Sequence, residues 1–177
     1  MATFQDRIIR AAKLDVHLYE EVEADKGAMG QAMGVVVLSS IAGGIGTPAG
    51  VGLSGILIGT IAALVAWYVW AFLTYLIGTK LLPETQTKAD VGELLRTIGF
   101  SSSPGMIRVL GIIPFLRGLV FLVAGVWMLV AMIIAVRQAL DYRSTLRAVG
   151  VCIIGWIVQA LILVVVFFIV GGAGGPV

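Results

Sequence analysis

The residue best suited to chemistry is Arg108, which lies within the otherwise apolar stretch from Ile98 to Leu116. Its guanidinium stays protonated and can bind a carboxylate or a phosphate through two parallel hydrogen bonds. An arginine at the centre of a membrane span costs about 2.5–3.5 kcal/mol on insertion scales, so it needs water or a partner. Arg108 could therefore contact an anion on a solute path. Alternatively, its guanidinium could bind backbone carbonyls or extend to the membrane surface, and we favour this structural role.

Gln159 is the other polar residue deep within an apolar block. We expect its amide to form a hydrogen bond with a neighbouring helix, a contact worth roughly 0.6–2 kcal/mol inside a membrane. The expected membrane spans contain no carboxylate, so a proton relay through Asp or Glu cannot be built in them.

Other residues that could support catalysis are scarce. The single histidine, His17, excludes haem or copper sites with several histidines, and no glycine-rich loop ends in Gly-Lys-Ser/Thr. The single cysteine, Cys152, excludes an internal disulfide. One acidic run lacks the fixed spacing of metal ligands, so we expect a solvated face there: Glu20, Glu21, Glu23 and Asp25. We expect no enzyme activity, no bound metal and no cofactor.

The composition indicates which elements must hold these residues. Of 177 residues, 59% are hydrophobic and 12% are charged, with a mean hydropathy of +1.05. A soluble domain has roughly 45–50% apolar and about 25% charged residues, so this chain should be an integral membrane protein with the lipid bilayer as its solvent. The net charge of +2 does not indicate nucleic-acid binding, because the basic residues lie between apolar blocks and form no continuous stripe.

The apolar blocks predict an all-α, polytopic bundle of five transmembrane helices, at about 31–46, 53–77, 98–116, 119–136 and 150–170. The third span is the least regular, because Pro104 and Gly105 precede Arg108. A broken helix that crosses once and a re-entrant hairpin both remain open there.

Basic residues favour the crossing helix. They cluster before the first span, after the second, and between the last two: Arg7, Arg10, Lys13 and Lys26; Lys80, Lys88 and Arg96; and Arg137, Arg143 and Arg147. Basic residues gather on the cytoplasmic side of membranes, and the three clusters share a side only if 98–116 crosses once. The N-terminus is then cytoplasmic, and the turn at 47–50 and the tail at 171–177 lie opposite.

Two cytoplasmic segments have amphipathic helix patterns. In residues 1–29 an apolar face includes Phe4 and Ile8, so this segment could lie in the lipid headgroup layer or pack against the protein's own loops. Tyr19, Glu20 and Glu21 form a candidate interaction surface in it. The second segment is Thr87–Phe100, where Thr87 and Asp90 have capping-box spacing.

Small residues form a stripe along the second span, at Gly55, Gly59, Ala62 or Ala63, and Ala66. Such stripes let helix backbones approach closely in lipid, where no hydrophobic effect drives helices together. Gly55 and Gly59 are therefore candidate contacts, within the bundle or with another subunit or a second copy of the chain.

The five-span layout and several local patterns resemble the Yip1-domain membrane proteins, in particular their bacterial members. The patterns are Arg10-Ala11-Ala12-Lys13-Leu14-Asp15 before Leu18–Asp25; Leu94-Leu95-Arg96 with Gly99-Phe100 and Ser103-Pro104; Ile113-Pro114; and Trp127 with Ala135–Leu140. The resemblance implies that residues 30–177 form a five-helix Yip1-like domain without enzyme activity. Eukaryotic members contact prenylated small GTPases in vesicle traffic through an Asp-Leu-Tyr-Gly-Pro motif. Leu18-Tyr19-Glu20-Glu21 stands in its place here, so GTPase binding is not carried over.

Two functions follow as expectations. The first is a scaffold or accessory subunit of a membrane assembly in the inner (plasma) membrane, with other membrane proteins or a second copy as partners. The second is a small transporter or channel that uses Arg108 in a broken third helix. The second function requires a polar cavity that reaches Arg108.

Overall fold

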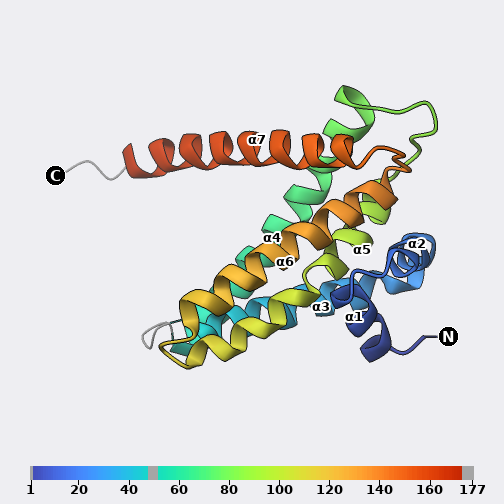
Figure 1. Ribbon diagram of the computed structural model, residues 1–177. Coiled ribbons are helices and arrows are strands. Elements are labelled where there is room, and N and C mark those ends of the chain that lie inside the picture. The colour runs from blue at the N-terminus through green and yellow to red at the C-terminus, as the bar shows by residue number, and fades with distance from the viewer. Residues whose placement is uncertain (1, 48–51, 173–177) are drawn as a thin grey trace.

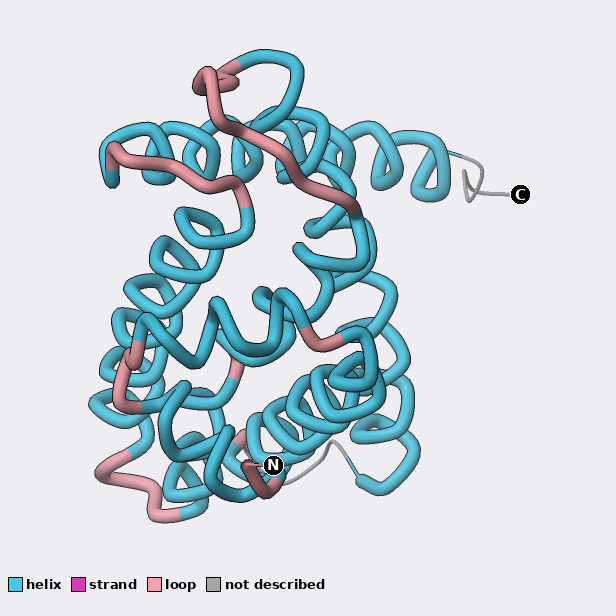
Figure 2. The backbone as a smooth tube through the Cα atoms, turned by 90° about the vertical axis from the view of Figure 1, so that its right-hand side faces the viewer, coloured by secondary structure: helices cyan, strands magenta, loops and turns pink. Residues whose placement is uncertain are grey.

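The computed structural model describes residues 2–47 and 52–172, and within them the chain forms helices and loops but no strand (Figure 2). Residues 48–50 of the expected turn at 47–50, and residues 173–177 of the expected tail at 171–177, lie outside the described residues. The elements are α1 (Phe4–Ala12), α2 (Val16–Ala24), η1 (Lys26–Ala28), α3 (Met29–Gly46), α4 (Gly52–Leu76), η2 (Ile77–Leu81), α5 (Val91–Ser101), η3 (Ser103–Ile112), α6 (Arg117–Ala139) and α7 (Thr145–Gly172).

Within the described residues, four helical segments are long and apolar enough to cross a membrane: Lys26–Gly46, Gly52–Leu81, Arg117–Ala139 and Thr145–Ile162. They correspond to four of the five expected spans, at 31–46, 53–77, 119–136 and 150–170. The all-α, multi-pass architecture is thus confirmed, while the count of five stays a prediction.

The third expected span, 98–116, is not one continuous helix. It comprises the end of α5, the 3₁₀-helix η3 and a turn, with Pro104 at the start of η3. Proline lacks a backbone donor, which explains why the α-helix is not continued. Even so, α5 and η3 together run beside α3 and α6 (Figure 1). Arg117 Nε donates to the carbonyls of Gly46 and Gly111, at 3.2 Å each, so η3 ends where α3 ends.

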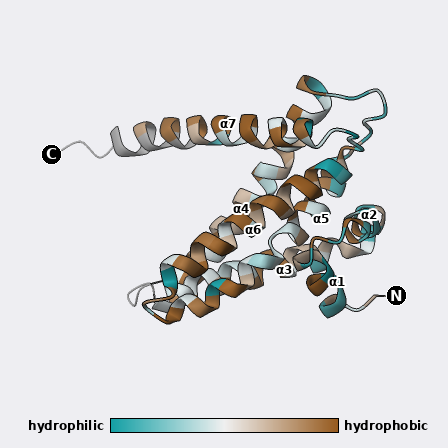
Figure 3. Cartoon of the chain, viewed as in Figure 1, coloured by the Kyte–Doolittle hydropathy of each residue, from teal (hydrophilic) through white to brown (hydrophobic). Residues whose placement is uncertain are grey.

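Polar residues gather at the opposite end of the bundle (Figure 3). The α4–α5 and α6–α7 connections meet there: Tyr142 Oη donates to the carbonyls of Gly78 and Leu82, and Arg147 pairs with Glu84 at 3.4 Å. The residues of two basic clusters lie in these connections or in the helices beside them, and the N-terminal helices pack nearby. The side of the membrane that this end of the bundle faces stays a prediction.

The N-terminal helices pack against the protein itself. Leu18, Tyr19 and Val22 are fully buried against α3, α5 and α6 residues that include Val35 and Phe100. The expectation that Tyr19 belongs to an interaction surface is therefore wrong: its hydroxyl donates to the Ala11 carbonyl at 3.3 Å in the core. A helical pattern identifies an apolar face without identifying what covers it.

The basic residues of α1 also turn inward. Arg7, only 6% exposed, donates to Glu21 at 2.9 Å, to Asp25 at 2.8 Å and to Gln31 at 2.9 Å. Arg10 pairs with Asp15 at 2.8 Å and with Glu21 at 2.6 Å. These arginines neutralise the chain's own acidic run instead of facing anionic lipid, so half of the expected solvated acidic face is internally paired.

The second amphipathic helix, α5, begins later than expected. Asp90 is its N-cap and forms a reciprocal capping box with Glu93, while Thr87 accepts a hydrogen bond from the Glu84 amide outside the helix. Asp is as good an N-cap as Ser or Thr, and the pair Asp90–Glu93 has the same spacing as Thr87–Asp90.

Helix α7 is attached to the bundle mainly through its first half. Ala148, Val151 and Cys152 are buried, and a Cβ on Gly155 would lie 3.0 Å from the ring of Trp70. Beyond that point α7 extends away from α6 (Figure 1). Its apolar residues there, such as Leu161 and Val165, are more than half exposed, as expected for side chains facing lipid.

Candidate functional site

A cavity of about 670 Å³ lies between α3, α4, α6, η3 and the middle of α7. Its polar lining residues are Ser39, Ser40, Thr47, Ser102, Arg108 and Gln159, and its other lining residues are glycines or apolar. It brings together both polar residues that the sequence singled out within the membrane. The two come from segments about 50 residues apart, so only the fold makes them neighbours of one cavity.

Arg108 is held by backbone and hydroxyl oxygens. Its Nε donates to the Gly105 carbonyl at 2.9 Å, and Nη2 donates to the carbonyl and hydroxyl of Ser39 at 2.7 and 2.8 Å. This is the carbonyl pairing that we favoured from the sequence. Among the described residues, however, Nη1 has no hydrogen-bond partner and the guanidinium has no carboxylate partner. The positive charge is held in place but not neutralised.

Glycines make this position of Arg108 possible. A Cβ on Gly43 would lie 3.2 Å from the guanidinium carbon, and one on Gly105 would collide with the Ser39 hydroxyl and lie 2.8 Å from Met128 Sδ. Side chains at these two positions would push the guanidinium out of its place. The sequence indicated that Gly105 breaks a helix, but its close contact with α3 could not be predicted from the sequence alone.

The small-residue stripe of α4 lines this cavity. Gly55, Gly59, Ala63 and Ala66 all face it, and a Cβ on Gly59 would meet no atom within 4 Å. Gly59 therefore does not form the close helix contact expected within the bundle. The stripe leaves open volume, because no described helix packs against it at Gly59.

Gln159 also differs from expectation. Its Oε1 is buried without a hydrogen-bond partner among the described residues, so the expected bond to a neighbouring helix is not formed. Gln159 lies on the part of α7 that leaves the bundle, and its amide faces the cavity instead. A buried carbonyl oxygen without a donor costs about 1–3 kcal/mol, which makes it a receptive site for a ligand hydroxyl or for water.

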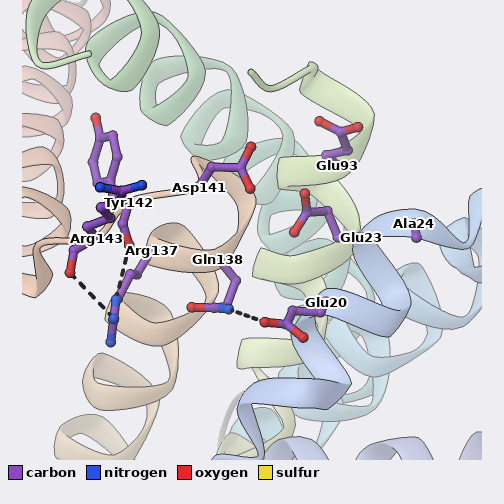
Figure 4. A pocket seen from close by; sticks show the side chains of 9 residues that line it. All are labelled: Glu20, Glu23, Ala24, Glu93, Arg137, Gln138, Asp141, Tyr142 and Arg143. Carbon is purple, nitrogen blue, oxygen red and sulfur yellow. Dashed lines mark hydrogen bonds between the residues drawn. The ribbon is translucent and has the colours of Figure 1, made fainter. Parts of the chain in front are cut away.

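A second pocket, of about 570 Å³, opens at the polar end of the bundle, and Figure 4 shows its side chains. Four carboxylates line it: Glu20 and Glu23 from α2, Glu93 from α5, and Asp141 from the turn after α6. Within the part of the chain that the structure describes, none of the four pairs with a lysine or arginine. Two arginines, Arg137 and Arg143, also line the pocket, and Arg137 donates to the backbone carbonyls of Tyr142 and Arg143. With four carboxylates and two arginines, the lining has more acidic than basic groups.

Glu23 has the most perturbed acidity in this pocket. The pKa of Glu23 is raised to about 7, chiefly by burial and then by the nearby carboxylates of Asp141, Glu93 and Glu20 in that order, while Arg96 opposes them. Asp141, Glu93 and Arg96 lie outside α2, so the shift in the pKa of Glu23 depends on the tertiary structure.

Of the three residues expected at an interaction surface here, only Glu20 lines the pocket, where it accepts a hydrogen bond from Gln138 at 2.9 Å. Glu21 is occupied by Arg7 and Arg10. Sequence reasoning placed Glu23 in a solvated run and missed Glu93 and Asp141. No pattern in the sequence links Glu23, Glu93 and Asp141, because these three residues lie on separate segments of the chain.

The family model of the Yip1 domain matches residues 26–167 of this chain. The chain belongs to the Yip1 domain family. Searches among curated proteins and among solved structures gave no match.

The two pockets relate differently to the Yip1 domain. Every residue lining the intramembrane cavity falls within the matched range. The acidic pocket is formed at its border, because Glu20, Glu23 and Ala24 precede the match. Among the described residues, no group of three His, Cys, Asp or Glu side chains could hold a metal ion, so the four carboxylates do not converge as metal ligands would.

The raised pKa of Glu23 predicts an unusual pH dependence of stability. Between about pH 4.5 and 7 the folded state keeps a proton on Glu23 that the unfolded state releases. The free energy of unfolding should therefore fall as pH rises through this window. Glu23→Gln, which imitates the protonated acid, should remove this decline, as measured by melting temperature in detergent from pH 4.5 to 8.

The matched control is Glu20→Gln, on the same helix and in the same pocket, which should keep most of the decline. The lowered pKa values of Glu21 and Asp25 act below pH 4.5 and do not contribute in this window. Identical pH profiles for wild type and Glu23→Gln would show that Glu23 titrates normally.

Proposed function

We propose that this Yip1-domain protein is a bacterial-type, non-catalytic scaffold or accessory subunit of the inner (plasma) membrane, which docks a basic segment of a partner protein in its acidic pocket. The observation that carries the proposal is the set of four carboxylates in one pocket, which outnumber its two arginines, Arg137 and Arg143, and form no ion pair with lysine or arginine among the described residues. Their mutual repulsion is relieved when lysine or arginine side chains enter.

The pocket is preformed, which favours docking. Arg96, only 4% exposed, donates from Nε to the Val22 carbonyl at 2.9 Å and also to the Glu23 carbonyl, and so fixes the end of α2. Arg7 fixes the same helix from the other side through Glu21. Binding of a partner therefore costs less conformational entropy than it would if these carboxylates were on a flexible tail.

The non-catalytic role is supported by the placement of the reactive side chains. His17 is 85% exposed and contacts Glu20, not a hydroxyl or a thiol. Cys152 is buried in the packed half of α7. Neither is arranged as a nucleophile beside a base.

A photo-crosslinking amino acid at Ala24, an exposed residue of the pocket, tests this function in native membranes. We expect a discrete adduct with one membrane or membrane-associated protein. The double variant Glu23→Gln and Asp141→Asn should reduce the yield of this adduct about tenfold, as expected when one or two charge-assisted contacts are lost. Asn at position 141 tolerates the backbone φ of 53° found there.

The same photo-crosslinker at Lys88, an exposed position on the α4–α5 connection, is the control and should give no such adduct. Equal adducts at Ala24 and Lys88, or an adduct indifferent to the double variant, would contradict docking in the pocket. A protein that yields no adduct at Ala24 in native membranes would contradict the accessory role itself.

The cavity that reaches Arg108 supports the second candidate, a small transporter or channel. Its glycine-rich and apolar lining suits an amphiphile better than a hydrated ion. We therefore propose transport only as the secondary function.

A further inference from the structure

We propose that the intramembrane cavity is a binding site for one anionic glycerophospholipid, with the lipid phosphate at Arg108 and one acyl chain along the small-residue stripe of α4. The proposal does not depend on the partner docking proposed above. It rests on the charge and the depth of Arg108 and on the residues that line the cavity.

The charge of Arg108 favours an anion. The guanidinium is fixed by Gly105 and Ser39, yet Nη1 is without a hydrogen bond and no carboxylate balances the charge among the described residues. A phosphate oxygen accepting from Nη1 completes the hydrogen bonds of this group, and its negative charge offsets the cost of burying the cation.

The depth of Arg108 places it in the half of the bundle away from Lys80. Ser39 binds Arg108, and its neighbour Ser40 donates to Thr60 at 3.0 Å, so Arg108 and Thr60 lie at about the same level. Thr60 is 20 residues, or about 30 Å of helix, from Lys80 and eight residues, or about 12 Å, from the first residue of α4, Gly52. A phosphate bound to Arg108 therefore sits deeper than the phosphates of the surrounding lipids, as expected for a lipid held inside the cavity.

The lining suits an acyl chain. From the level of Thr60 the cavity continues along Ala63, Ala66 and Trp70 towards the middle of the membrane. The ten residues from Thr60 to Trp70 correspond to about 15 Å, which is half of the hydrocarbon layer and so the length available to the chain of one leaflet. Met128 and Met132 form the facing wall, and methionine adapts to irregular apolar ligands.

The charge of the headgroup distinguishes two common lipids. Phosphatidylglycerol has a net negative charge that can balance Arg108, whereas a choline headgroup adds a positive charge beside it. Gln159 takes no part in this choice, because it lies one helical turn past Gly155, which packs against Trp70 at the chain end of the cavity.

The charge of Arg108 argues against a helix as occupant. An apolar helix packed into the cavity would bury the guanidinium further without supplying an anion, whereas a lipid phosphate supplies one.

Lipid retention by native mass spectrometry tests the site. The full chain is exchanged into nanodiscs of equal parts phosphatidylglycerol and phosphatidylcholine with identical acyl chains. We expect one tightly retained phosphatidylglycerol per chain. Arg108→Gln and Gly59→Leu should each lower its retention about tenfold, the first by removing the charge and the second by filling the cavity.

Matched controls use positions that do not line the cavity. Arg117→Gln removes an arginine that donates to backbone carbonyls, and Gly125→Leu adds a side chain to an exposed glycine of α6 with no atom within 4 Å. Both should retain the lipid as wild type does. Because Gly59→Leu adds its side chain in open space, it keeps the test valid even if Arg108→Gln fails to fold.

Three outcomes would overturn the proposal. Equal retention of the two lipids would show that the net negative charge and the headgroup of phosphatidylglycerol are not recognised. Release of the lipid by millimolar inorganic phosphate would show a free-anion site without an acyl chain. A chain dimer in place of a bound lipid, abolished by Gly59→Leu, would assign the cavity to helix association.

Discussion

Gly46→Ala should destabilise the protein by about 3 kcal/mol, one of the largest effects of a single added methyl group in this chain. A Cβ on Gly46 would overlap the backbone carbonyl of Arg108 and lie 3.1 Å from the Phe121 ring. The obstacle is backbone, which cannot rotate away as a flexible side chain can, so η3 must shift relative to α3. The measurement is the denaturant-induced unfolding of the purified protein in detergent, followed by circular dichroism.

Gly30→Ala is the matched control on the same helix, since a Cβ there meets nothing within 4 Å. It should stabilise the protein by about 0.5–1 kcal/mol, because alanine favours helix more than glycine does. If Gly46→Ala unfolds no earlier than Gly30→Ala, the close packing of α3 against η3 is wrong.

Arg7→Ala should lower the free energy of unfolding by about 2–3 kcal/mol. The side chain of Arg7 is 7% exposed and serves Glu21, Asp25 and Gln31, so its loss leaves two carboxylates close together without their cation. The carboxylates are 32% and 41% exposed, and water offsets part of the loss. Melting temperature and protease cleavage between α1 and α3 would both report the loosened N-terminal helices.

Lys13→Ala, an exposed residue one position past α1 with no salt bridge among the described residues, should change stability by less than about 0.5 kcal/mol. Arg7→Lys should lower the free energy of unfolding by an intermediate amount, because an ammonium group cannot donate to three acceptors in one plane as a guanidinium does. If Arg7→Ala behaved like Lys13→Ala, the N-terminal helices would not be held by this network.

The amphipathic pattern of residues 1–29 left two environments open, and packing of the helices settled between them. Phe4 and Ile8 contact the same core as Leu18 and Phe100, so the protein's own helices provide the apolar surface. Had these side chains faced lipid, Arg7 and Arg10 would have been free for phosphates. Their pairing with Glu21 removes that possibility.

The sequence by itself determined that this is an all-α, multi-pass membrane protein of the Yip1 domain family. Blocks such as Leu53–Ile77 are apolar over the length of a bilayer, and in lipid each such block must satisfy its backbone within itself as a helix. That constraint is local, so no knowledge of packing is needed. The charge clusters likewise indicate their side of the membrane one segment at a time.

Only the tertiary structure decided what faces what. The stripe at Gly59 lines a cavity instead of a helix contact, and Gln159 Oε1 has no hydrogen-bond partner among the described residues because α7 leaves the bundle. The acidic pocket joins Glu23, Glu93 and Asp141 from three segments. Helical periodicity states which residues share a face, but the object covering that face depends on angles between helices. Those angles are set by contacts between residues far apart in the chain, such as Gly46 and Arg108.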